Sequence, residues 1–86
     1  MKEVEVGKVA DFFQKIGVVA IEVTSGEIKV GDTIHFLGHT TDFSQKINSM
    51  QIEHDSVQTA KAGDNVGIKV SDRVRTHDHV YKVVED

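Results

Sequence analysis

Histidines and carboxylates are the side chains of this sequence that could do chemistry. The histidines are His35, His39, His54, His77 and His79. The spacing His77-Asp78-His79 would put two imidazoles on one face of a strand, where a third ligand could complete a metal site. The chain has no cysteine and no His-Glu-x-x-His motif, so the pattern favours solvated loop histidines, and no metal or other cofactor is expected.

A catalytic arrangement is equally hard to find. Glu53-His54-Asp55 is a local cluster of acids and an imidazole, but neighbours along a strand point to opposite faces and do not form a proton relay. The serines lack the glycine-flanked nucleophile elbow, and the carboxylates fall in turns or on strand faces. The sequence therefore predicts no catalytic residue and a protein that is not an enzyme.

Length and charge narrow the classes of partner. The 86 residues fit one domain over 1–86. Ten Lys and Arg against fourteen Asp and Glu give a formal charge of −4. Any RNA contact would therefore be local rather than based mainly on neutralisation of the phosphate backbone. Without cysteines, a leader or a long apolar segment, we expect a cytoplasmic protein with no membrane partner.

The elements that must position these residues are β-strands. Apolar and polar residues alternate over 4–6, 19–23, 34–36, 50–52, 66–70 and 81–83. Gly31-Asp32 and Gly63-Asp64 each precede such a run, as in a turn where glycine takes a positive φ and aspartate bonds the backbone two residues on. Ile47 and Met50 have opposite parity, which predicts a bulge or bend near Asn48.

Six short strands in a chain of this size predict an all-β fold, a small closed six-stranded antiparallel Greek-key barrel. Closure would remove the exposed strand edges that promote aggregation. Residues 56–62 carry no clear alternation and are expected to be a connection.

Two segments of the sequence carry a paired motif. In residues 18–32, two valines lead through a glycine turn to Lys29-Val30-Gly31-Asp32. In residues 47–68, a strand ending in His54 is followed by the turn Gly63-Asp64-Asn65-Val66-Gly67. Together they resemble the second, β-barrel domain of translational GTPases such as elongation factors Tu and one-alpha. The resemblance extends over about 4–83 and implies a stand-alone barrel of the translation-protein type.

GTP hydrolysis does not follow from this resemblance. The chain has no Gly-x-x-x-x-Gly-Lys-Ser/Thr phosphate loop and no guanine-reading Asn-Lys-x-Asp, so no nucleotide partner is expected.

What the resemblance does imply is a contact with the aminoacyl end of tRNA. His54 and Asn65 match positions of the family motif, and with Lys61 they form the predicted RNA-binding patch, in which the imidazole could stack on a terminal adenine. The alternatives are structural: Asn65 would bond only its turn backbone, and His54 would cap a strand in water. Gly7-Lys8-Val9-Ala10 stands where the family has acidic and aromatic pocket residues, and Arg75-Thr76-His77-Asp78 replaces its usual Arg-x-Gly-Asp.

Phe12 and Phe13 suggest a different partner. Adjacent strand residues face opposite sides, so one ring could enter the core and the other could anchor a protein, unless the chain curls and buries both.

Two hypotheses for the function of the chain follow from these observations. The first is a non-catalytic module that contacts tRNA or other RNA, and the alternative is a protein-interaction adaptor for a larger peptidase-like or RNA-modifying enzyme.

Overall fold

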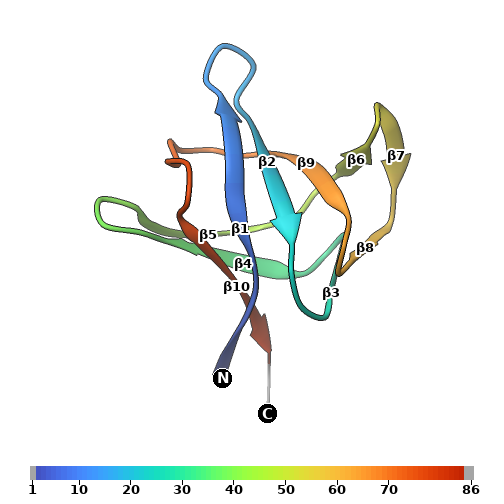
Figure 1. Cartoon of the computed structure of the whole chain (residues 1–86), viewed down its shortest axis with the longest axis horizontal. Helices are drawn as coiled ribbons and strands as arrows, with labels where there is room; N and C mark the ends of the chain where they lie inside the picture. Colours follow the sequence, from blue (N-terminus) through green and yellow to red (C-terminus); the bar gives the residue numbers. More distant parts are fainter. Residues whose placement is uncertain (1, 85–86) are drawn as a thin grey trace.

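The computed structural model describes residues 2–84, whose regular elements are all β-strands. Eight strands form one antiparallel sheet in the order β5-β4-β10-β1-β2-β9-β6-β7, and β3 pairs with β8 in a second sheet (Figure 1). The all-β class is confirmed, and within this range no helix is long and apolar enough to cross a membrane. The strands are β1 (Lys2–Phe13), β2 (Val18–Val23), β3 (Glu27–Lys29), β4 (Thr33–Leu37), β5 (Asp42–Lys46), β6 (Met50–Ile52), β7 (Asp55–Val57), β8 (Thr59–Lys61), β9 (Asn65–Lys69) and β10 (His79–Val84).

The six predicted strands correspond to β1, β2, β4, β6, β9 and β10, and four more strands were not predicted. Three of these, β3, β7 and β8, each have three residues and contain only one apolar residue, too few to display an alternating pattern. The fourth, β5, contains one apolar residue, Phe43. Residues 56–62, predicted as a connection, instead contribute to β7 and β8.

The sheet does not close, contrary to the closed barrel predicted, because its outer strands β5 and β7 do not pair with each other. Between β5 and β6 the chain leaves the strand conformation at residues 47–49, which lets both Ile47 and Met50 point into the core. The side chain of Gln45 on β5 instead bonds the chain at the end of β9. Its Nε2 donates to the Lys69 carbonyl at 2.9 Å, and its Oε1 accepts the Ser71 backbone N–H at 2.9 Å.

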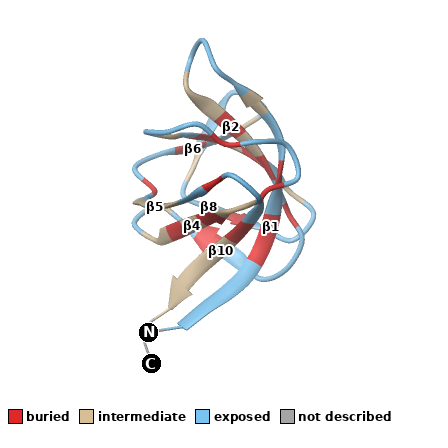
Figure 2. Ribbon diagram, turned by 90° about the vertical axis from the view of Figure 1, so that its left-hand side faces the viewer, coloured by how far each residue is buried: buried red, intermediate tan, exposed pale blue. Residues whose placement is uncertain are grey.

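The core lies inside the curled sheet. Figure 2 shows the buried segments gathered in its middle, while the hairpin tips are exposed. Long β1 bends at register shifts between Glu5 and Gly7 and between Val9 and Asp11. Gly7 permits a close approach of β2, because a Cβ there would lie 2.3 Å from the Glu22 carbonyl oxygen. The buried apolar residues are Val6, Val9, Val19, Ile21, Val23, Ile28, Ile34, Phe36, Ile47, Met50, Ala60, Val66, Ile68, Val74 and Val80.

Three turns of one construction immediately precede β4, β9 and β10. In each, the aspartate carboxylate accepts the backbone N–H of the residue three positions earlier, at 2.8, 3.0 and 2.8 Å, rather than bonding two residues on as predicted. The aspartate N–H donates back to the carbonyl of that same residue. The turns are Lys29-Val30-Gly31-Asp32, Lys61-Ala62-Gly63-Asp64 and Arg75-Thr76-His77-Asp78.

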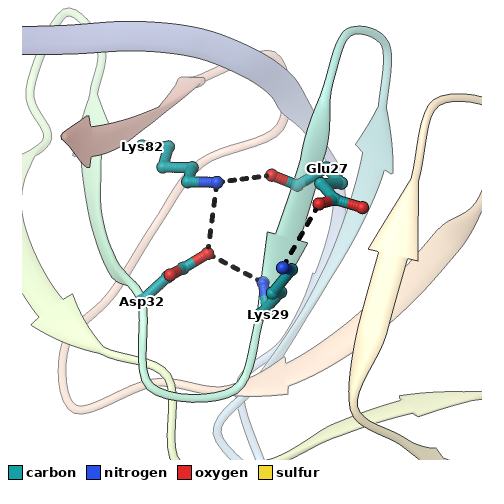
Figure 3. Close-up of polar contacts among 4 residues, drawn as sticks. All are labelled: Glu27, Lys29, Asp32 and Lys82. Carbon is teal, nitrogen blue, oxygen red and sulfur yellow. Dashed lines mark hydrogen bonds and ion pairs between the residues drawn. The ribbon is translucent and has the colours of Figure 1, made fainter.

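The third residue of each turn has a positive φ: 101° at Gly31, 98° at Gly63 and 76° at His77. His77 therefore occupies a glycine position, and the third turn keeps the construction of the other two despite its different sequence. Figure 3 shows the first turn, in which the Asp32 carboxylate also lies 3.5 Å from the Lys82 ammonium of β10.

Candidate functional site

An apolar groove of about 460 Å³ crosses the outer face of β2 and β9. Val19, Ile21 and Val23 of β2 face the core, so Val18 and Ala20 face outward. We call this feature the outer groove. Its lining residues are Phe13, Ile16, Val18, Ala20, Gln51, Glu53, His54, Asn65, Val66 and Gly67.

Gly67 has no side chain and therefore leaves space at the floor of the outer groove. It pairs with Ala20 of β2 on one side and with Gln51 of β6 on the other. A Cβ at this position would meet Val18 Cγ1 at 3.5 Å and the Gln51 carbonyl oxygen at 3.8 Å, which are ordinary contacts. The absence of a side chain here is therefore not demanded by packing, and a larger residue would occupy the groove.

One wall of the outer groove is the tip of the β1–β2 hairpin, where the last residue of β1 and a loop residue present two large apolar side chains to solvent. Phe13 is 48% exposed and Ile16 is 62% exposed. The loop is held by hydrogen bonds from the Ile16 and Gly17 N–H groups to the Phe13 carbonyl. Phe12 behaves differently, because it is half-buried and packs against the core. Of the two predicted partner-binding residues, Phe13 is thus the exposed one, and its proximity to Ile16 in a concave site is typical of binding surfaces.

The opposite wall is the β6–β7 turn. Ile52 pairs with Asp55, which leaves Glu53 and His54 as a two-residue loop with φ of 51° and 70°. Two positive φ values define a type I′ turn, where Asn-Gly is strongly preferred and where other residues are strained. The groove thus has one apolar wall and one strained polar wall.

The structure brings together two of the three residues predicted to contact RNA. His54 and Asn65 both line the outer groove, from the β6–β7 turn and from the start of β9. Lys61 does not line it: this residue ends β8, pairs with Glu27 of β3, and opens the turn that separates β8 from β9. The predicted patch is therefore split, although its three members lie close in sequence.

Ile16, Val18, Ala20 and Gly67 were missed as groove residues by the sequence analysis. The sequence did contain a signal for Val18 and Ala20, because residues 18–21 are all apolar. A strand with apolar residues on both faces either is covered on both faces or exposes one apolar face to solvent. The approach of the β1–β2 loop to the β6–β7 turn depends on the pairing of β2, β9 and β6, which no local pattern encodes.

Apart from the outer groove, a cluster of polar side chains lies on the outer surface of β1, β4 and β10. His35 Nδ1 lies 2.8 Å from Glu3 Oε1, and its Nε2 lies 2.6 Å from Asp42 Oδ1. The hydrogen bond with Glu3, followed by that with Asp42, raises the pKa of His35 above its ordinary 6.5. The imidazole therefore connects β1, β4 and β5 through two carboxylates.

His79 completes this cluster rather than lying solvated in a loop as predicted. It begins β10, and its Nδ1 is 2.5 Å from Glu5 Oε2. The Tyr81 ring lies between the two imidazoles, 6.2 Å from His35 and 6.3 Å from His79. Across residues 2–84, no three His, Asp or Glu side chains are grouped in a way that could hold a metal ion.

Comparison with known proteins adds a family and a set of relatives. Residues 17–73 match the family model described as elongation factor Tu domain 2. The chain is 40% identical over 85 residues to an uncharacterized protease of Methanocaldococcus jannaschii and 34% identical over 82 residues to a collagenase of Porphyromonas gingivalis. Its fold matches the C-terminal domain of a Geobacillus thermoleovorans protein described as a U32 peptidase, with a TM-score of 0.86, 19% identity, and coverage of 93% of this chain and 92% of that one.

The curated relatives are much longer than this chain. The match to the protease includes 98% of this chain but only 21% of the protease. The match to the collagenase includes 94% of this chain but only 20% of the collagenase. The prediction that the chain is not an enzyme is overturned by the peptidase names of these relatives. The missing GTPase motifs bear only on nucleotide hydrolysis.

Proposed function

This chain belongs to the family of elongation factor Tu domain 2, and from that premise we propose that it is a docking module for a larger peptidase-like protein. The observation that carries the proposal is the outer groove, where Phe13 and Ile16 expose apolar surface beside a cavity of about 460 Å³. Relatives named as peptidases, of which this chain matches about a fifth, support a larger protein of that type as the partner.

The groove suits an apolar side chain of the partner. Such a side chain would enter above Gly67 and pack between Phe13 and Ile16 on one side and the β6–β7 turn on the other. The amides of Gln51 and Asn65 at the rim would bond backbone groups of the bound segment. Burial of apolar surface supplies the affinity, and the rim amides set the orientation.

The test is binding of this chain to the part of the M. jannaschii relative that it does not match, measured by titration calorimetry. Gly67→Val fills the groove while leaving a β-branched residue in a strand, so we expect about tenfold weaker binding with unchanged or higher thermal stability. Ile16→Ser removes one wall and should weaken binding in the same way.

Val4→Ser is the matched control, because Val4 is also an exposed apolar side chain, at 45%, but does not line the groove. It should bind like the unaltered chain. Binding that survives Gly67→Val, or that falls equally with Val4→Ser, would place the contact elsewhere on the surface.

RNA is a second candidate ligand, favoured by the meeting of His54 and Asn65 in the outer groove. The exposed imidazole of His54 offers a stacking surface to an unpaired terminal base. Amide NMR during titration with deacylated tRNA should shift His54 and Asn65, and tRNA that lacks its 3′ end should not. If low-salt titration moves neither resonance, RNA is not the ligand of this groove.

A further inference from the structure

A second concave surface lies on the other side of the β1–β2 hairpin from the outer groove. It consists of three adjoining hollows of about 270, 520 and 630 Å³, all lined by Arg73. The β9–β10 connection forms its centre, between the β1–β2 and β4–β5 hairpins (Figure 1). We call it the arginine surface.

The backbone that carries the two arginines of this surface is fixed. Val74 between them is 2% exposed and belongs to the core, whereas Arg73 and Arg75 are exposed and both line the hollows. The Arg73 N–H donates to Asp72 Oδ1 at 2.7 Å, and the Arg75 N–H donates to Asp78 Oδ2 at 2.8 Å. Less ordering entropy is therefore lost when a ligand is bound here than on a mobile loop.

Both guanidinium groups are available for a ligand. Within residues 2–84, neither lies within 4 Å of a carboxylate oxygen in an ion pair. The carboxylates that line the hollows already have other hydrogen-bond partners: Asp11 accepts the Phe12 N–H, Asp42 bonds His35, and Asp72 accepts the Arg73 N–H. Among the described residues, neither arginine side chain forms a hydrogen bond or an ion pair, and both lie in a concave, polar setting.

We propose that the arginine surface binds an acidic peptide segment of a partner protein, with one carboxylate on each guanidinium. The planar fork of arginine matches a carboxylate through two parallel hydrogen bonds. Side-chain amide and hydroxyl groups of Gln14, Thr40 and Thr76, which line the same hollows, can bond the peptide backbone between the two acids.

The distribution of charge favours a peptide over a nucleic acid. Asp11, Asp42 and Asp72 line the same hollows and would repel a continuous phosphate backbone, and the whole chain carries a formal charge of −4. A peptide can place acids only where the two arginines are and uncharged residues opposite the aspartates. The proposal does not rest on the outer groove, from which the β1–β2 hairpin separates this surface.

The test is amide NMR of the full chain during titration with a blocked glycine-rich peptide that contains two Glu residues. We expect shifts at residues 71–76 and at Gln14, about tenfold weaker binding for Arg73→Gln, and partial recovery for Arg73→Lys. Lys29→Gln is the control with an equal change of charge, since Lys29 pairs with Glu27 away from the hollows. It should bind like the unaltered chain.

Three results would overturn the proposal. The peptide with Gln in place of Glu could bind equally, Lys29→Gln could weaken binding as much as Arg73→Gln, or an oligouridine could shift residues 71–76 where the acidic peptide does not. Gly67→Val leaves the arginine surface intact, so peptide binding by that variant separates a failure here from a failure at the outer groove.

Discussion

His35 is the side chain through which pH acts most directly on this fold. It bonds Glu3 of β1 with one ring nitrogen and Asp42 of β5 with the other, from its own place on β4. A protonated imidazole can donate to both carboxylates at once, whereas the neutral ring has one donor. The protonated form is therefore the one that holds the three strands together.

The first prediction concerns the free energy of unfolding as a function of pH. The pKa of His35 is raised in the folded state, so its stabilisation is fully present below the unfolded value of 6.5 and is lost as pH rises through the folded pKa. We expect the difference in unfolding free energy between the unaltered chain and His35→Gln to be larger at about pH 6 than at about pH 8. Urea denaturation at both pH values measures it, and a difference that is constant or larger at the higher pH would contradict the assignment.

His77 carries local strain for a different reason. Its φ of 76° lies in the left-handed region, which costs a residue with a Cβ about 1–2 kcal/mol. The matching positions in the two related turns, Gly31 and Gly63, have glycine. The hydrogen bonds between Arg75 and Asp78 hold the third turn in place despite this cost.

The second prediction follows from that comparison. His77→Gly should raise the free energy of unfolding by about 0.5–1 kcal/mol, because relief of the left-handed strain exceeds the entropic cost of glycine in the unfolded chain. Gly63→Ala should lower it by a similar amount, since its φ is 98°. Thermal denaturation of both variants decides the matter, and a destabilised His77→Gly would show that the imidazole makes a stabilising contact.

Among the elements, the β6–β7 hairpin joins local strain to a binding surface. Its loop residues Glu53 and His54 both have positive φ, and both line the outer groove. Strained residues persist where the surrounding structure fixes them and are frequent at binding sites. The polar wall of the outer groove is thus less stable than a hairpin optimised for its turn type.

The third prediction separates stability from binding at this hairpin. Replacing Glu53-His54 by Asn-Gly should raise the free energy of unfolding by about 1–2 kcal/mol, because these residues suit a type I′ turn. If RNA is the ligand of the groove, the same variant should lose the shifts caused by the tRNA 3′ end. Urea denaturation and the NMR titration on one sample test both, and lower stability would contradict the turn assignment.

Strand prediction succeeded where apolar residues alternate with polar ones and failed where a strand contains a single apolar residue. The inward residues of β2 and β9, such as Ile21 and Ile68, follow a period of two that is visible in the sequence. β3 and β8 form because the chain is brought back beside itself, which places Ile28 opposite Ala60. Pairings that depend on tertiary proximity leave no local signature.

The residues of the candidate site could be predicted from the sequence only in part. His54 and Asn65 were identified from a motif, and the structure places both in one groove. Lys61 was predicted to belong to the same patch, but the turn from Lys61 to Asp64 reverses the chain, and Lys61 does not line the groove. Phe13 could not be told from Phe12, because the register shift between Val9 and Asp11 alters the parity of β1.

Across the complete fold, the side chain of Gln45 forms a seam between the edge strand β5 and the end of β9. Backbone pairing is absent between β5 and β7, and the Gln45 amide spans from β5 to the end of β9 by bonding Lys69 and Ser71. A side-chain amide carries the same donor and acceptor as a peptide group, so it can substitute for one step of a ladder.

The fourth prediction is that Gln45→Ala loosens this seam. It removes the bonds to Lys69 and Ser71, so the free energy of unfolding should fall by about 1–2 kcal/mol and the Ser71 amide should exchange with solvent faster. Gln51→Ala is the control, since Gln51 is exposed and forms no side-chain hydrogen bond among residues 2–84. Equal effects of the two substitutions would show that the seam does not depend on Gln45.

The two ends of the described chain lie side by side, because Lys2 of β1 pairs with Val84 of β10 (Figure 1). Hydrogen bonds between antiparallel strands run perpendicular to the strands, so a force that pulls these two ends apart acts along the bonds and breaks them one pair after another. The domain should therefore peel open under low mechanical tension, even though β1 is its longest strand and pairs on both edges. An optical-trap measurement would find a high unfolding force only if tension were applied instead between the β1–β2 loop and the C-terminal end of β10, where β1 and β10 would have to shear.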